Sequence, residues 1–186
     1  YQATIPVYSN DLNTGDELGY DVSINDWNES VVGAPGDNSH LGAVYLFQRD
    51  LNNSLSQSHK IVPNLAAGES NRTKFGAAIS TYENKLIIGA PDASDFRGKV
   101  YYYERNDGNY SMVQELTDSN GSLDEQFGYA LVLGNEGDEL FVGSPHEKNT
   151  GEKGIGKVTQ FSFDGTGWVQ EMQFWSSDDQ NITGDL

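Results

Sequence analysis

The chain has 186 residues and no cysteine, and it carries a formal net charge of −17, with 28 acidic against 11 basic residues. This charge excludes nucleic acids and anionic membranes as main partners, because both present negative fields. The absence of cysteine excludes a disulfide framework and a thiolate zinc site. No apolar run is long enough to span a bilayer, and Tyr1 begins no signal-peptide pattern.

Short β-branched and aromatic runs, bounded by Gly, Asn, Asp and Pro, predict strands along the whole chain. The expected strands fall into three sets of four. The sets comprise 20–24, 30–33, 43–47 and 58–62; 77–80, 85–88, 99–103 and 110–114; and 129–132, 139–142, 157–161 and 168–172. Asp107-Gly108 and Asp164-Gly165 predict tight hairpin turns between the third and fourth strands of their sets. No stretch predicts a helix of useful length.

A motif that occurs three times accompanies these strands. In each copy Phe or Leu precedes Gly, and Gly-Ala-Pro or Gly-Ser-Pro follows after a strand. The copies are Leu18-Gly19 with Gly33-Ala34-Pro35, Phe75-Gly76 with Gly89-Ala90-Pro91, and Phe127-Gly128 with Gly143-Ser144-Pro145. The leading glycines recur at intervals of 57 and 52 residues. A period of this size, with four antiparallel strands in each repeat, is typical of β-propeller blades.

The three copies resemble FG-GAP repeats, which form the blades of the integrin α-subunit propeller. The strands at 42–47, 98–103 and 156–161 strengthen the resemblance. It implies an all-β fold of four-stranded antiparallel blades, as part of a larger propeller or of one completed by oligomerisation. We expect the last strand of a preceding blade and a linker at 1–17, then blade 1 at 18–74, blade 2 at 75–126, and blade 3 with the start of a further linker at 127–186.

Three blades are fewer than the four to eight with which propellers close. Either the chain is a segment of a longer propeller, or several copies close a ring in which each lends its first strand to a neighbour. The segment is the favoured interpretation, because repeat arrays are built from many copies.

Six Asn-x-Ser/Thr sequons occur in expected loops, where glycans can be accommodated. Their asparagines are Asn28, Asn52, Asn71, Asn109, Asn120 and Asn181. The sequence therefore predicts a secreted or cell-surface glycoprotein.

Calcium is the first cofactor to consider, because metal-bearing members of the family carry an Asp-rich loop between the two halves of the motif. Here the corresponding intervals are too short for that ligand register. Only the third interval keeps several oxygen-bearing side chains, which makes Asn135 and Asp138 weak candidate Ca²⁺ ligands. We expect no cofactor to be required.

No catalytic constellation is predicted. His40, His59 and His146 lack metal-ligand spacing, and the chain has neither a Gly-x-Ser-x-Gly elbow nor a phosphate-cradling loop. We therefore expect that the chain is not an enzyme.

The loops that join the second strand to the third and one blade to the next are expected to emerge on one face. In the integrin family this face contacts ligands and the partner subunit. The resemblance therefore implies candidate partner-binding residues at Asp37, Asp92, Asp95, Phe96, Arg97 and Glu147. An aromatic residue beside an arginine suits an interface hot spot, which favours Phe96-Arg97, although Phe96 could instead pack inward.

The predicted function is that of a non-catalytic extracellular structural or adhesion module that binds a protein partner or self-assembles. Two alternatives stay open: a carbohydrate-binding module, and an accessory propeller of a larger secreted enzyme. Tyr101, Tyr102, Tyr103 and Trp168 could stack on a sugar. Side-chain alternation along a strand favours their packing between blades instead. No membrane insertion by this segment is expected.

Overall fold

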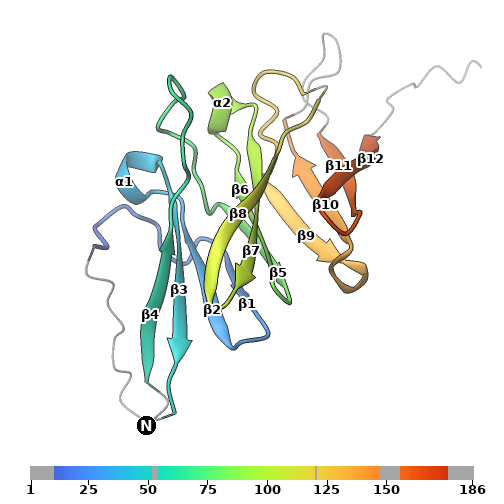
Figure 1. The fold of residues 1–186 in the computed structure, drawn as a ribbon. Helices are drawn as coiled ribbons and strands as arrows, with labels where there is room; N and C mark the ends of the chain where they lie inside the picture. The colour runs from blue at the N-terminus through green and yellow to red at the C-terminus, as the bar shows by residue number, and fades with distance from the viewer. Residues whose placement is uncertain (1–10, 52–53, 120, 147–155, 176–186) are drawn as a thin grey trace, which may run out of the picture.

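The computed structural model describes residues 11–51, 54–119, 121–146 and 156–175 (Figure 1). These residues form three four-stranded antiparallel sheets and almost no helix. Within each sheet the strands follow one another in chain order, so neighbours in the sequence are neighbours in space. The prediction of an all-β fold of four-stranded antiparallel units is confirmed.

Each predicted strand overlaps one strand of the structure, and the ends differ by up to three residues. The first sheet contains β1 (Val22–Ile24), β2 (Glu29–Ala34), β3 (Ala43–Arg49) and β4 (Leu55–Ile61). The second contains β5 (Ala78–Tyr82), β6 (Lys85–Ala90), β7 (Lys99–Asn106) and β8 (Asn109–Leu116). The third contains β9 (Ala130–Gly134), β10 (Glu139–Ser144), β11 (Lys157–Phe163) and β12 (Trp168–Trp175). Three single turns complete the described elements: α1 (Asp37–His40), α2 (Ala93–Phe96) and η1 (Asn135–Gly137).

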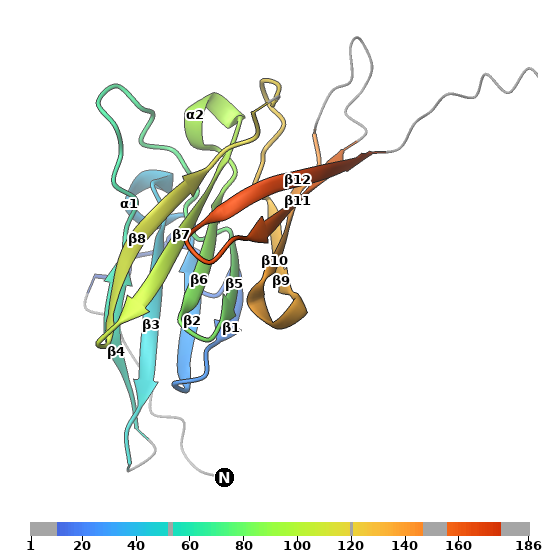
Figure 2. The ribbon, with the colours of Figure 1, turned by 45° about the vertical axis from the view of Figure 1, so that its right-hand side comes forward.

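The three sheets stand beside one another in the manner of propeller blades, without closing a ring (Figures 1 and 2). The first strands of the sheets are neighbours, since β5 contacts both β1 and β9. The turns α1 and α2 and the connections between sheets gather at one end of the molecule (Figure 1). This common end is the one that the sequence analysis predicts for the loops.

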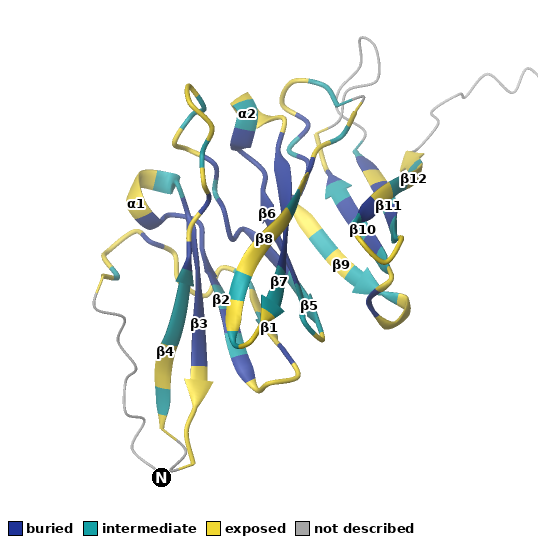
Figure 3. Cartoon of the chain, viewed as in Figure 1, coloured by how far each residue is buried: buried dark blue, intermediate teal, exposed yellow. Residues whose placement is uncertain are grey.

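Two apolar cores lie between successive sheets, and Figure 3 shows the buried positions along the facing strands. The first core joins Val31, Val44, Leu46 and Ile61 to Phe75, Ile79, Leu86, Ile88, Tyr101 and Tyr103. The second joins Ile87, Val100, Tyr102 and Leu116 to Phe127, Leu140, Val142, Phe161 and Trp168. The three tyrosines of β7 thus alternate between the two cores. As predicted, they and Trp168 are packing residues.

The repeated glycines have a steric explanation at these junctions. A Cβ atom on Gly33 would come within 2.0 Å of the Gly76 carbonyl oxygen, and one on Gly89 within 2.1 Å of the Gly128 oxygen. Because these two glycines have no Cβ, the Phe-Gly backbone of the following sheet can pack directly against them. The pairing between third and fourth strands also shifts at the same step in every sheet, at 46/47, 102/103 and 160/161. The sheets are thus structural repeats residue by residue.

Among the described residues, no helix is long and apolar enough to cross a membrane.

Candidate partner-binding face

The loop end of the second sheet is built on an unusual left-handed turn. Ser94, Asp95 and Phe96 in α2 have φ values of 52°, 56° and 64°, and α1 repeats this geometry in the first sheet. A left-handed conformation costs a non-glycine residue roughly 1–2 kcal/mol. The following sheet offsets part of this cost, because the backbone N–H of Gln126 donates to the Phe96 carbonyl at 3.0 Å. The left-handed conformation of α2 is thus stabilised in part by the connection that leads into the third sheet.

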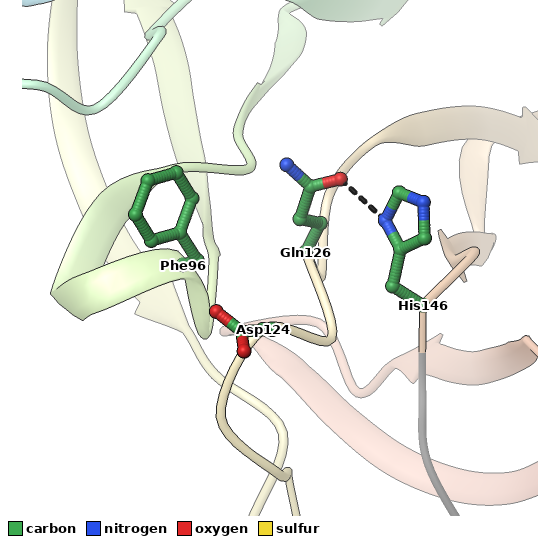
Figure 4. Close-up of a pocket in the computed structure, with 4 residues that line it drawn as sticks. All are labelled: Phe96, Asp124, Gln126 and His146. Atoms are coloured by element: carbon green, nitrogen blue, oxygen red, sulfur yellow. Dashed lines mark hydrogen bonds between the residues drawn. The ribbon is translucent and has the colours of Figure 1, made fainter. Parts of the chain in front are cut away.

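A pocket of about 260 Å³ opens beside this turn, between the second and third sheets (Figure 4). Its lining residues are Phe96, Asp124, Gln126 and His146. They come from α2, from the connection between β8 and β9, and from the loop after β10. The Phe96 side chain is 44 % exposed, so it does not pack inward. An aromatic surface is therefore available to a partner at the predicted position.

A chain of hydrogen bonds fixes the polar side of the pocket. The Gln126 amide nitrogen donates to Asp92 Oδ1 at 3.0 Å, which turns its oxygen toward His146. His146 Nδ1 lies 2.6 Å from that oxygen, as drawn in Figure 4, and must carry the proton of this bond. Lys74 closes the chain through its Nζ, 3.1 Å from Asp92 Oδ2. The arrangement holds Gln126 and His146 in place.

The other predicted partner-binding residues differ in accessibility. Asp95 and Arg97 are exposed on or beside α2, next to Phe96. Asp92 is buried and joined to Lys74 and Gln126, so its described role is structural. Glu147 lies outside the described residues.

Asp37 is likewise a buried structural residue. The Tyr45 hydroxyl donates to its Oδ2 at 2.5 Å, and Lys60 Nζ lies 2.9 Å from the same oxygen. Burial, together with the hydrogen bond to Asp37, raises the pKa of Tyr45 to about 12. The Asp37 carboxylate is therefore bound by side chains of the first sheet, to which it belongs.

The two weak candidates for calcium ligation lie around η1. Asn135 is its first residue, and Asp138 follows it with its Oδ1 3.2 Å from Lys85 Nζ. The positively charged ammonium group of Lys85 thus lies directly beside the Asp138 carboxylate. No group of three or more His, Asp or Glu side chains suited to a metal ion is found among the described residues.

Three of the sequon asparagines belong to the described ranges, and all three are exposed. Asn28 lies in the turn between β1 and β2, and Asn71 in the connection between the first two sheets. Asn109 is the first residue of β8 rather than a loop residue, because the hairpin turn at Asp107-Gly108 is so short that pairing begins directly after it. Asn52, Asn120 and Asn181 lie outside the described residues.

The sequence analysis does not single out Asp124 or Gln126, and it considers His146 only as a metal ligand. The repeat could have indicated these positions, because Gln126 and His146 correspond to Lys74 and Asp92 one sheet earlier. At the first junction the equivalent of Phe96 is His40. A phenylalanine at this position thus distinguishes the second junction from the first.

Four-stranded antiparallel sheets packed face to face, with their connections gathered at one end, define a propeller-type repeat protein. Residues 7–47 match the family model of the FG-GAP repeat, which confirms the resemblance that the motifs indicate. The match covers the first sheet as far as β3, and the later sheets repeat its strand order. Such repeats form propeller modules for protein–protein interaction. Comparison with curated proteins gives no match.

Proposed function

We propose that this chain is a non-catalytic extracellular glycoprotein module that binds a protein partner in a structural or adhesion role. The observation that carries the proposal is the exposed Phe96 beside the pocket at the second junction. Aromatic side chains held on a rigid support are typical anchors of interfaces. Here the support is the α2 turn, which a hydrogen bond from the backbone N–H of Gln126 ties to the connection that leads into the third sheet.

The charge around the pocket favours a basic partner surface. Asp95, which precedes Phe96 in the chain, is exposed, and so is Asp124, which lines the pocket together with Phe96. The net charge of −17 would accelerate encounters with a cationic protein at low ionic strength. A lysine or arginine side chain could lay its aliphatic stem on the Phe96 ring and reach a carboxylate with its charged end.

The proposal includes no catalytic step and no cofactor. Gln126, His146 and Asp92 bind one another in a supporting chain, rather than forming a nucleophile with its base. The carbohydrate-binding alternative loses its candidate stacking residues, because Tyr101, Tyr102, Tyr103 and Trp168 are buried.

Adhesion of cells of the source organism to the immobilised chain tests the partner-binding role. Phe96→Ala combined with Asp124→Asn is expected to weaken adhesion roughly 30-fold, because an interface hot spot contributes about 2 kcal/mol. Met112→Ala, at an exposed position on β8, is the matched control and should leave adhesion unchanged. Equal adhesion by both variants would contradict the assignment of this face.

The extracellular assignment has its own test. The native polypeptide should lose mass on enzymatic removal of N-glycans. Replacement of the exposed Asn71 by Gln should remove part of that loss. A mass that does not change would contradict the assignment while leaving the partner-binding role untouched.

A further inference from the structure

A buried cluster of one lysine and two carboxylates lies where the connection from the second sheet meets the third sheet. Lys157 is the first residue of β11, and its Nζ contacts Asp118 Oδ2 and lies 3.5 Å from Glu125 Oε2. The side chains of Lys157, Asp118 and Glu125 are 4 %, 0 % and 1 % exposed. An amine and two carboxyl groups are thus held together out of contact with bulk solvent.

The lysine–carboxylate pairs of the other two sheets are more open to solvent. In the second sheet Lys99 Nζ contacts Glu69 and lies 2.8 Å from Glu115 Oε1, and these two carboxylate side chains are 20 % and 37 % exposed. In the first sheet the Lys60 side chain is itself 25 % exposed. Water stabilises the ions in both places, whereas burial penalises ions far more than neutral groups. Among these three clusters, the one at Lys157 therefore most favours a reaction that consumes both charges.

Hydrogen bonds fix both carboxylates of the buried cluster. Gln173 Nε2 donates to Asp118 Oδ2 at 2.8 Å, and the backbone N–H of Ser122 donates to Glu125 Oε2 at 2.8 Å. A donor at a carboxyl oxygen stabilises the negative charge that develops there when a nucleophile adds to the carbon. Fixed neighbours also replace a bimolecular encounter, which corresponds to effective concentrations on the order of 10⁵–10⁸ M in well-oriented systems. The arrangement thus favours addition of the lysine amine to the Asp118 carboxyl group.

We propose that Lys157 and Asp118 condense to an amide, so that an isopeptide bond joins the third sheet to the connection from the second. The new bond links Lys157 Nζ to Asp118 Cγ, and one oxygen of the Asp118 carboxyl group leaves as water. The ammonium group supplies both protons of that water and the carboxylate supplies its oxygen. The step is therefore balanced without an oxidant, a reductant or another co-reactant.

Glu125 carries a proton during this condensation. Lysine attacks as the neutral amine, so Nζ first gives up one proton, and Glu125 Oε2 is placed to accept it. Glu125 then returns this proton to the departing oxygen, and the second amine proton follows once the bond between nitrogen and carbon has formed. Glu125 ends in the state in which it began.

The crosslink adds a property that the proposed partner-binding function does not require. It closes the chain between residues 118 and 157, a stretch that includes β9 and β10. A covalent link of this kind restricts the unfolded chain and so favours the folded state. It also keeps the third sheet joined to the second when the chain is pulled.

Peptide mapping under denaturing conditions tests the bond, because an ion pair does not survive such treatment. After removal of any N-glycans, trypsin should release one branched peptide that contains both Asp118 and Lys157, since trypsin does not cleave after an acylated lysine. The mass of this peptide should be lower by one water molecule than the sum of its two arms. Complete cleavage after Lys157, with unbranched peptides of full mass, would overturn the proposal.

Glu125→Gln tests the proton transfer with little change of shape. A positioned acid–base group contributes roughly 10²–10⁴ in rate, so little branched peptide should form in the time that the wild-type chain needs to react completely. Glu69→Gln is the matched control, because it removes a carboxylate from Lys99 in the second sheet. This variant should give as much branched peptide as the wild-type chain.

Circular dichroism establishes that both variants fold. A branched peptide at the wild-type level in folded Glu125→Gln would overturn the role of Glu125. Its loss from both folded variants would overturn that role as well, because the yield would then follow the stability of the chain rather than proton transfer. The mapping of the wild-type chain decides the existence of the bond even where Glu125→Gln does not fold.

Discussion

In each sheet, one lysine forms an ion pair with the chain segment that precedes the sheet. Lys60 Nζ lies 2.5 Å from Asp11, ahead of the first sheet, and Lys99 forms an ion pair with Glu69, ahead of the second. Buried Lys157 contacts the carboxylates of Asp118 and Glu125, ahead of the third. The hydrogen bond from Lys99 also holds the pKa of Glu69 below its ordinary value. Single residues thus anchor the connections that position the loop end.

Buried tyrosines predict how stability responds to alkaline pH. Burial raises the pKa of Tyr102 and Tyr103 from 10.0 to about 12. Because the folded pKa lies above the unfolded one, this contribution to stability is complete below pH 10 and is lost as the pH rises toward 12. Each such tyrosine should lower the free energy of unfolding by up to about 1.4 kcal/mol per pH unit in that window.

The measurement is urea denaturation at a series of pH values between 10 and 12, together with the ultraviolet absorbance of tyrosinate. Tyr102→Phe should lose little packing and should give a shallower pH dependence than the wild-type chain. A free energy of unfolding that stays constant between pH 10 and pH 12 would contradict the prediction.

The glycines of the repeated motif make a prediction about the junctions between elements. Gly89→Ala places a Cβ about 2.1 Å from the Gly128 carbonyl oxygen, so β6 and the start of the third sheet must move apart. We expect a loss of about 3 kcal/mol in the free energy of unfolding, as for severe overpacking. Gly143→Ala is the control, because its Cβ would make only ordinary contacts within the third sheet.

Urea denaturation of both variants checks this difference. Gly143→Ala should change the free energy of unfolding by about 0.5 kcal/mol or less, the range of ordinary surface changes. Equal destabilisation by the two substitutions would contradict the steric explanation of the motif.

The sequence predicts the strands well because short hydrophobic runs and turn residues are local signals. The ends of β1 and β8 are less predictable, since a turn at Tyr20 and a tight hairpin before Asn109 decide them. The left-handed turn at α2 carries no local signal, because glycine is absent from Ala93–Phe96. That turn depends on hydrogen bonds from Gln126, which belongs to the next sheet.

The sequence likewise predicts only part of the pocket. Its aromatic residue stands out beside Arg97 in the sequence, but its partners Gln126 and His146 come from separate connections. Burial of Asp37 and Asp92 also depends on contacts between elements, with Tyr45 and Lys60 in one case and Lys74 in the other. Pairings of this kind follow from the fold rather than from the spacing of residues.

At the scale of the whole molecule, the net charge of −17 decides how binding of a cationic partner responds to salt. The exposed carboxylates of Asp95 and Asp124 contribute to the negative field at the loop end. Salt screens the attraction between this field and a positively charged surface: the Debye length falls from about 30 Å at 0.01 M to about 10 Å at 0.1 M.

Partner binding at the acidic loop end should therefore weaken as salt is added, by roughly a factor of ten between these two ionic strengths, because screening weakens attraction between unlike charges. The adhesion assay of the proposed function, repeated at both ionic strengths, measures this response. Adhesion that stays constant or strengthens with salt would contradict a basic partner surface, while leaving the role of Phe96 to be tested by its own substitution.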